Sequence, residues 1–129
     1  MRQMVIGVAL LCSVGSAAAL DGNKLLTGCT AVVRFLDAGN KGLDDNEMMD
    51  SSLCLGMMEG VSHTVLTESF LAERTQQKSL LATCLPSDGI NNGQAARIVV
   101  RYLNQNPDKL HLSAAMLTLF AFKNSFPCK

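Results

Sequence analysis

The sequence predicts an all-α protein, a small compact bundle of four or five helices tied by two disulfides. Apolar residues recur at steps of three and four residues through separate segments, which is the pattern of amphipathic helices. Polar capping residues, glycines and prolines stand at the ends of these segments. The chain has 129 residues, of which 48% are hydrophobic and 17% charged, so one folded domain is expected rather than a disordered chain.

The first 19 residues have the pattern of a secretory signal peptide. Arg2 supplies a charged start, residues 5–14 are mainly apolar, and residues 17–19 are alanines suited to cleavage. The apolar stretch is about half as long as the roughly 20 residues that span a bilayer, which favours cleavage over a retained anchor. We therefore expect residues 1–19 to be removed and residues 20–129 to form a single exported domain.

The cysteine count predicts two disulfides. Cleavage removes Cys12, and an even number of cysteines in a small exported domain indicates oxidation. The four that remain are Cys29, Cys54, Cys84 and Cys128. Zinc is the alternative, but the sequence has no Cys-x-x-Cys motif and only two histidines. We expect no metal site and no cofactor.

The first helix is expected over residues 23–38. Asp21 or Asn23 can cap its first amides, and Gly39 supplies a stop. Its buried face is formed by Leu25, Leu26, Cys29, Val32, Val33 and Leu36.

A long second helix is expected to start at Asp44 or Asp45. One face carries apolar residues at helical spacing, namely Cys54, Met58, Val61 and Val65. A second stripe contains Gly56, Gly60, His63 and Thr67. A glycine inside a helix costs about 1 kcal/mol relative to alanine, so this stripe predicts close approach of another backbone. The polar stretch 68–83 is expected to extend the helix and then become a solvated connection before residues 79–81 return to the core.

Two shorter helices complete the predicted bundle. Asn91 and Gln94 have capping-box spacing at the start of the third helix, and Pro107 follows its end. Ser113 is expected to cap a fourth helix that runs to about Lys123. This last helix is apolar on almost every side, and a domain of this size has little room to bury it completely. We therefore expect part of it to face a second copy of the chain in a homodimer.

Charge and motifs argue against several functions. The formal net charge is zero and there is no run of Lys or Arg, which argues against nucleic-acid binding and against a polybasic membrane patch. The sequence has no His-Glu-x-x-His, Gly-x-Ser-x-Gly or Gly-x-x-x-x-Gly-Lys motif. Cys84 with His111 is the nearest approach to a nucleophile pair, but a cysteine in a disulfide offers no thiolate. We expect no enzymatic activity and no catalytic residues.

Several short motifs occur in a distinctive order. They are Cys54-Leu55-Gly56, Met57-Met58-Glu59-Gly60-Val61, Cys84-Leu85-Pro86, Val99-Val100-Arg101-Tyr102-Leu103, Asn106-Pro107-Asp108-Lys109-Leu110-His111-Leu112-Ser113-Ala114-Ala115 and Phe126-Pro127-Cys128. Over residues 22–128 the chain resembles the Tai/Rap family of periplasmic immunity proteins, which protect bacteria against peptidoglycan amidases delivered by type VI secretion.

The resemblance implies a small helical protein of the periplasm, usually dimeric, that inhibits a Cys-His amidase by placing a protruding segment in its substrate groove. The partner would be the cognate amidase effector, with no nucleic acid and no membrane involved after signal cleavage. Residues 68–78 occupy the place of that segment. The candidate partner-binding residues are Glu68, Ser69, Glu73, Arg74, Gln76 and Lys78. The alternatives are a periplasmic adaptor or structural protein on the same scaffold, and a small-ligand carrier with the methionines of the second helix as a pocket wall.

Four cysteines allow three disulfide connectivities, and sequence alone does not choose among them. We favour Cys29 with Cys128, which would tie the first helix to the C-terminal end and close a very long loop, a cross-link that chain-entropy arguments estimate at about 4 to 5 kcal/mol. Cys54 with Cys84 would then hold the second helix against the start of the third.

Overall fold

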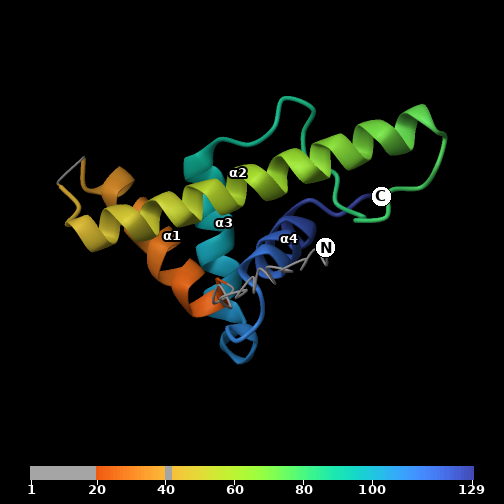
Figure 1. Cartoon of the computed structure of the whole chain (residues 1–129). Coiled ribbons are helices and arrows are strands. Elements are labelled where there is room, and N and C mark those ends of the chain that lie inside the picture. Colours follow the sequence, from red (N-terminus) through yellow and green to blue (C-terminus); the bar gives the residue numbers. More distant parts are fainter. Residues whose placement is uncertain (1–19, 40–41) are drawn as a thin grey trace, which may run out of the picture.

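The computed structural model describes residues 20–39 and 42–129. Along the chain this part contains α1 (Gly22–Asp37), α2 (Asp45–Arg74), α3 (Asn92–Gln105), the short 3-10 helix η1 (Pro107–Lys109) and α4 (Ala114–Ser125), with no strand among them (Figure 1). The predicted all-α fold with two disulfides is confirmed. The predicted signal peptide lies outside the described residues.

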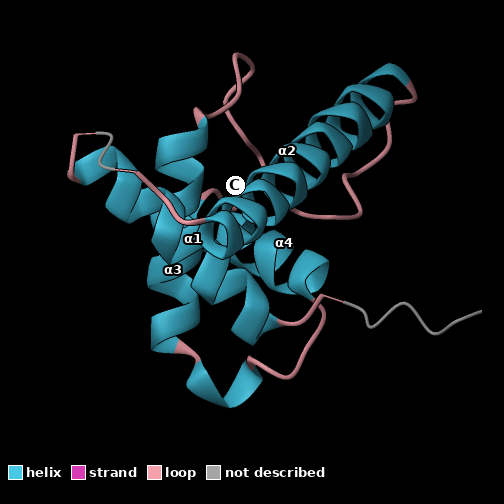
Figure 2. Ribbon diagram, turned by 60° about the vertical axis from the view of Figure 1, so that its left-hand side comes forward, coloured by secondary structure: helices cyan, strands magenta, loops and turns pink. Residues whose placement is uncertain are grey.

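Three helices pack around one part of a much longer one. α1, α3 and α4 gather along the N-terminal and central parts of α2, while the C-terminal part of α2 continues beyond them (Figure 1). Figure 2 shows the same helix leaving the bundle. The chain then returns through an irregular segment to the start of α3. The bundle therefore carries one extended projection.

The predicted caps define most of the helix starts. The Asp21 side chain accepts a hydrogen bond from Lys24 N, and the Asn91 side chain accepts one from Gln94 N. At α2, Asp44 and Glu47 form a reciprocal capping box. Ser113 occupies the N-cap position of α4, but its side chain makes no capping hydrogen bond.

The start of α4 is held by backbone pairing instead of by a side-chain cap. The Ala114 amide donates to the Leu20 carbonyl oxygen at 2.8 Å, and the Gly22 amide donates to the Leu112 carbonyl oxygen at 3.0 Å. This pairing fastens the first turn of α1 to the start of α4. Ser113 is the N-cap residue of α4, as predicted, but its side chain makes no capping hydrogen bond; the Leu20 carbonyl holds the first amide of α4 instead.

One hydrophobic core joins all four α-helices. Its largest fully buried side chains include Leu25 of α1, Met58 of α2, Leu103 of α3, and Leu117 and Phe122 of α4. The predicted apolar faces of the helices meet here, which explains why their three- and four-residue periodicity identified them. The prediction is wrong for Leu36, which is 45% exposed because it lies in the last turn of α1, beyond the core.

The glycine stripe of α2 does not meet another backbone within the described chain. A Cβ atom added at Gly56 or Gly60 would have no neighbour within 4 Å. The close helix approach occurs elsewhere, where Gly28 of α1 faces the backbone carbonyl of Asp50 of α2. The prediction that another backbone approaches this stripe is therefore wrong within one chain. The spacing of glycines along a helix does not reveal which segment faces that side of the helix.

The favoured disulfide pairing is also wrong. Cys29 pairs with Cys54, and Cys84 pairs with Cys128, with Cα–Cα distances of 5.2 and 5.0 Å. A disulfide requires Cα atoms within about 7 Å, so proximity in the fold selects the pairs. Loop entropy determines how much a disulfide contributes to stability, but it does not determine which cysteines pair. The first disulfide joins α1 to α2 in the core, and the second joins the returning chain to the C-terminus.

Candidate partner-binding site

The projection consists of the last turns of α2 and the segment that returns from it. We call residues 68–82 the tip. Helix α2 ends at Arg74, so the seven helical residues from Glu68 to Arg74 give the tip a rigid stretch of about 10 Å. The prediction that residues 68–83 extend the helix and then become a connection is confirmed, but the expected return of residues 79–81 to the core is wrong at Leu80, which is 91% exposed.

Helix α2 ends in a Schellman motif that turns the chain back. The Gln77 amide donates to the Ala72 carbonyl at 2.9 Å, and the Gln76 amide donates to the Glu73 carbonyl at 3.2 Å. Gln76 has φ = 53°, the left-handed conformation that this motif requires and that glycine usually supplies. The turn at the end of the tip is thus fixed by hydrogen bonds.

Hydrogen bonds to Glu68 hold the returning segment against helix α2, a contact that we call the clamp. Its carboxylate accepts hydrogen bonds from Ser79 Oγ at 2.7 Å and from the Leu80 amide at 2.6 Å. Ser79 Oγ in turn lies 3.2 Å from the Ala82 amide, which donates to it. Both sides of the tip are therefore held together by contacts to one half-buried carboxylate.

The base of the tip is anchored to the C-terminus. The Cys84 amide donates to the Phe126 carbonyl at 2.9 Å, and Thr83 beside it is fully buried. The Cys84–Cys128 disulfide adds a covalent link at the same place. Because both ends of the tip are fixed, little conformational entropy remains to be lost when a partner binds.

The candidate contact residues predicted from the sequence divide into two groups. Glu68 and Ser69 are half-buried, and Glu68 is occupied by the clamp. The other four are exposed on the last turn of α2 and the turn after it, namely Glu73, Arg74, Gln76 and Lys78. The structure brings all six into the tip, but it gives Glu68 an internal structural role.

Sequence reasoning missed the apolar side chains of the tip. Phe70 and Leu71 are each 55% exposed, and Leu80 is 91% exposed. The Arg74 guanidinium lies over the Phe70 ring, 5.1 Å from its centroid, so that ring is held in a defined position. The sequence did contain a sign of this apolar surface, because Phe70, Leu71 and Leu80 interrupt its most polar stretch. Large exposed apolar side chains on a projection are typical of a protein-binding surface.

The cysteines and His63 are the side chains whose reactivity the sequence raised. All four cysteines of the described chain are in disulfides, so Cys84 has no thiolate to pair with His111. His63 is exposed on α2, and its Nε2 lies 2.9 Å from Glu59 Oε1 of the same helix. Within residues 20–39 and 42–129, no cluster of three metal-ligating side chains is found. In the same residues, no helix is both long and apolar enough to cross a bilayer.

Comparison with known proteins gives one match. The family model of the Rap1a immunity proteins matches residues 21–128. Neither the curated proteins nor the solved structures contain a significant match. The match covers all four helices and both disulfides. An immunity family implies a non-enzymatic role, in which the protein binds the effector that it neutralises. The chain therefore belongs to the Rap1a immunity protein family and is an immunity protein against a secreted effector.

Proposed function

We propose that this immunity protein acts in the periplasm, where it binds a type VI secreted peptidoglycan amidase and occludes its active site. The observation that carries the proposal is the tip, a braced projection with exposed apolar side chains. A convex element of this kind suits a concave substrate groove, which is the usual form of a hydrolase active site. The protein needs no chemistry of its own to exclude substrate from such a groove.

The apolar side chains of the tip favour tight binding. Phe70, Leu71 and Leu80 are exposed in the free protein, and burying a large apolar side chain contributes about 1.5 to 3 kcal/mol. The tip also carries exposed charged residues, Glu73, Arg74 and Lys78, and Arg74 contacts the Phe70 ring. An apolar centre within a polar rim is the usual anatomy of a protein interface.

Periplasmic action is supported by the cysteines. Disulfides persist in oxidising compartments, which in bacteria means outside the cytoplasm. The pairs Cys29–Cys54 and Cys84–Cys128 have the geometry of formed disulfides, and the first 19 residues have the pattern of an export signal.

The test is light scattering after size exclusion, on the oxidised protein mixed with the amidase encoded beside its gene, together with an amidase assay. We expect a joint peak and loss of amidase activity. Phe70→Asp and Leu80→Asp should each weaken the complex at least tenfold. Charge reversal at Glu73 or Arg74 should weaken it less, because rim charges contribute less than buried apolar anchors.

Met49→Asp is the matched control for Phe70→Asp. Met49 is 63% exposed and lies on the same helix, near its opposite end. It should leave the complex unchanged. Equal loss of binding in both variants would contradict a role for the tip. A protein that forms no complex with the amidase would instead fit the alternative of a periplasmic adaptor or structural protein.

We also propose that the protein is a homodimer formed through α4 and the middle of α2. Met116 and Phe120 of α4 are 46% and 37% exposed. Beside Met116, an apolar groove of about 390 Å³ lies between α4 and α2, and Val61 joins it to a second groove that contains Gly56 and Gly60. Because no backbone among the described residues approaches these glycines, the face is open to a second copy.

Light scattering on the protein alone tests the dimer. The wild type should have twice the mass of one chain, and Met116→Glu or Phe120→Glu should shift it toward the monomer. Leu36→Glu is the control, because Leu36 is 45% exposed but lies on α1, outside the proposed interface of α4 and the middle of α2. A wild-type protein that stays monomeric at high concentration would refute the dimer and leave the amidase proposal standing.

A further inference from the structure

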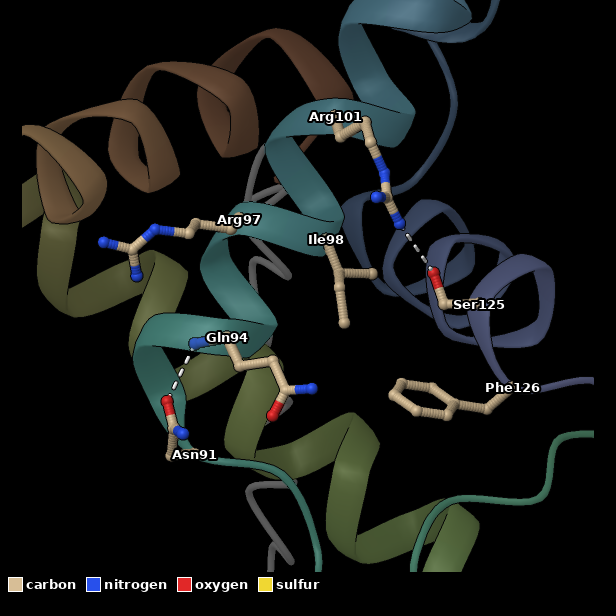
Figure 3. A pocket seen from close by; sticks show the side chains of 7 residues that line it. All are labelled: Asn91, Gln94, Arg97, Ile98, Arg101, Ser125 and Phe126. Carbon is tan, nitrogen blue, oxygen red and sulfur yellow. Dashed lines mark hydrogen bonds between the residues drawn. The ribbon is translucent and has the colours of Figure 1, made fainter.

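A polar groove lies between α3 and the C-terminal end of α4, apart from the residues of the tip. Its volume is about 670 Å³, and Figure 3 shows the side chains that line it. Gln94, Ile98 and Arg101 come from α3, while Ser125 and Phe126 come from the end of α4. Among the described residues that line the groove, none is acidic. It is thus a cavity of ligand size with a positive charge.

Two arginines border the groove, and only one of them is already paired. The Arg97 guanidinium forms an ion pair with Asp37 and donates to the Gly93 carbonyl at 3.2 Å. It points away from Phe126 in Figure 3. Arg97 therefore belongs to the contact between α1 and α3 and contributes little to a ligand in the groove.

The Arg101 guanidinium is free to bind an anion. No carboxylate of the described chain lies within ion-pair distance of it, and its contact with Ser125 Oγ is long, at 3.4 Å. Figure 3 shows this guanidinium at one rim, directed toward Ser125. Guanidinium carries five N–H donors in a planar fork that matches a carboxylate. One strong anion-binding group is therefore available in the groove.

The other walls suit an amide and an apolar group. The Gln94 carboxamide extends toward Phe126 from the side opposite Arg101, and Ile98 lies between them at the back (Figure 3). The Gln94 side chain takes part in no hydrogen bond with another described residue, so it can donate to and accept from a peptide bond. Ile98 and the half-buried Phe126 ring supply apolar contact.

We propose that this groove binds the free carboxylate of a peptide whose last residue has an apolar side chain. Arg101 and Ser125 would hold the carboxylate, Gln94 would bond the last peptide amide, and Ile98 with Phe126 would contact the side chain. One free guanidinium suits a singly charged carboxylate better than a phosphate, which carries more charge. The proposal is independent of the tip and of the amidase complex.

The experiment is an NMR titration of the oxidised protein with N-acetyl-alanyl-leucine and with the amide of the same dipeptide. Shifts in the acid titration should concentrate at residues 94–101 and 125–126. The acid should bind at least tenfold more tightly than the amide, because only the acid forms a charge-assisted pair with Arg101. Equal binding of acid and amide would overturn the proposal, as would no binding of the acid at millimolar concentration.

Substitutions distinguish binding in the groove from a general effect of the protein's charge on peptide affinity. Arg101→Gln should weaken binding of the acid about tenfold and abolish the difference between acid and amide, whereas Arg101→Lys should give intermediate affinity because it keeps the charge but loses the fork. Lys123→Gln makes the same charge change on α4 outside the groove and should have no effect. Unchanged binding by Arg101→Gln, with its fold verified by circular dichroism, would refute the assignment.

The carboxylate can come from a free short peptide or from the C-terminus of a protein. A ten-residue peptide that ends in alanyl-leucine distinguishes these sources. Equal affinity of the long and short peptides would identify a groove open to a protein terminus. Binding of the short peptide alone would restrict the groove to free peptides. Amidase inhibition measured on Arg101→Gln should stay unchanged in either case, which keeps this test separate from that of the tip.

Discussion

Gly28 of α1 faces the main-chain carbonyl of Asp50 of α2 so closely that an added Cβ atom would overlap that oxygen. The next residue, Cys29, forms the disulfide with Cys54 one helical turn beyond Asp50. The absence of a side chain at position 28 thus permits the helix approach that brings the two sulfur atoms together. The Lys24–Asp50 ion pair, at 2.8 Å, lies along the same contact.

Gly28→Ala should lower the free energy of unfolding by about 1 to 3 kcal/mol, because an overpacked contact against backbone cannot relax by side-chain rotation. Urea denaturation of the oxidised protein measures this change. Thr30→Ala is the control: Thr30 is exposed on the same helix, so alanine there should leave stability unchanged or raise it by about 0.5 kcal/mol. Equal stability of the two variants would contradict the close approach at Gly28.

The two disulfides should differ in their rate of reduction. Cys29 and Cys54 are 0% and 1% exposed, whereas Cys84 is exposed, and thiol–disulfide exchange requires access to a sulfur atom. Mild reduction followed by alkylation and mass spectrometry should label Cys84 and Cys128 first. Partner affinity should fall at this stage while helical circular dichroism persists. Simultaneous labelling of all four cysteines would contradict the difference in access.

Gln76→Gly should raise the free energy of unfolding by about 1 kcal/mol, because glycine occupies the left-handed region without the steric cost of a Cβ atom. Thermal and urea unfolding measure the gain. Gln76→Val should destabilise, since a β-branched residue is the least suited to that conformation. A stabilising valine would show that the Schellman turn does not form in solution.

Asp21 should make stability depend on acid pH. The hydrogen bond from Lys24 N to its carboxylate holds the pKa of Asp21 below the ordinary value of 3.8. The carboxylate therefore stabilises the fold above pH 3.8, and this contribution is lost as the pH falls through the lowered pKa. Melting temperatures of the wild type and Asp21→Asn between pH ~5 and pH ~2 should converge at the acid end. A constant difference would contradict a capping role for the charged form.

Local sequence determined the helices and most of their starts. The apolar periodicity of α1, α2 and α3 and the caps Asp21, Asp44 and Asn91 act within one or two turns, so they can be read without a partner segment. The same holds for the extension of α2 through the polar stretch. The ordered motifs of the chain also identified the family, which the match over residues 21–128 confirms.

Tertiary structure decided which segments meet. It paired Cys29 with Cys54 rather than with Cys128, and it placed the close helix approach at Gly28 rather than at Gly56. It also assigned Glu68 to an internal clamp and left Phe70 and Leu80 exposed. These outcomes depend on the relative positions of helices that are distant in the chain. The apolar periodicity of a helix indicates which face it buries, but it does not indicate which other helix packs against that face.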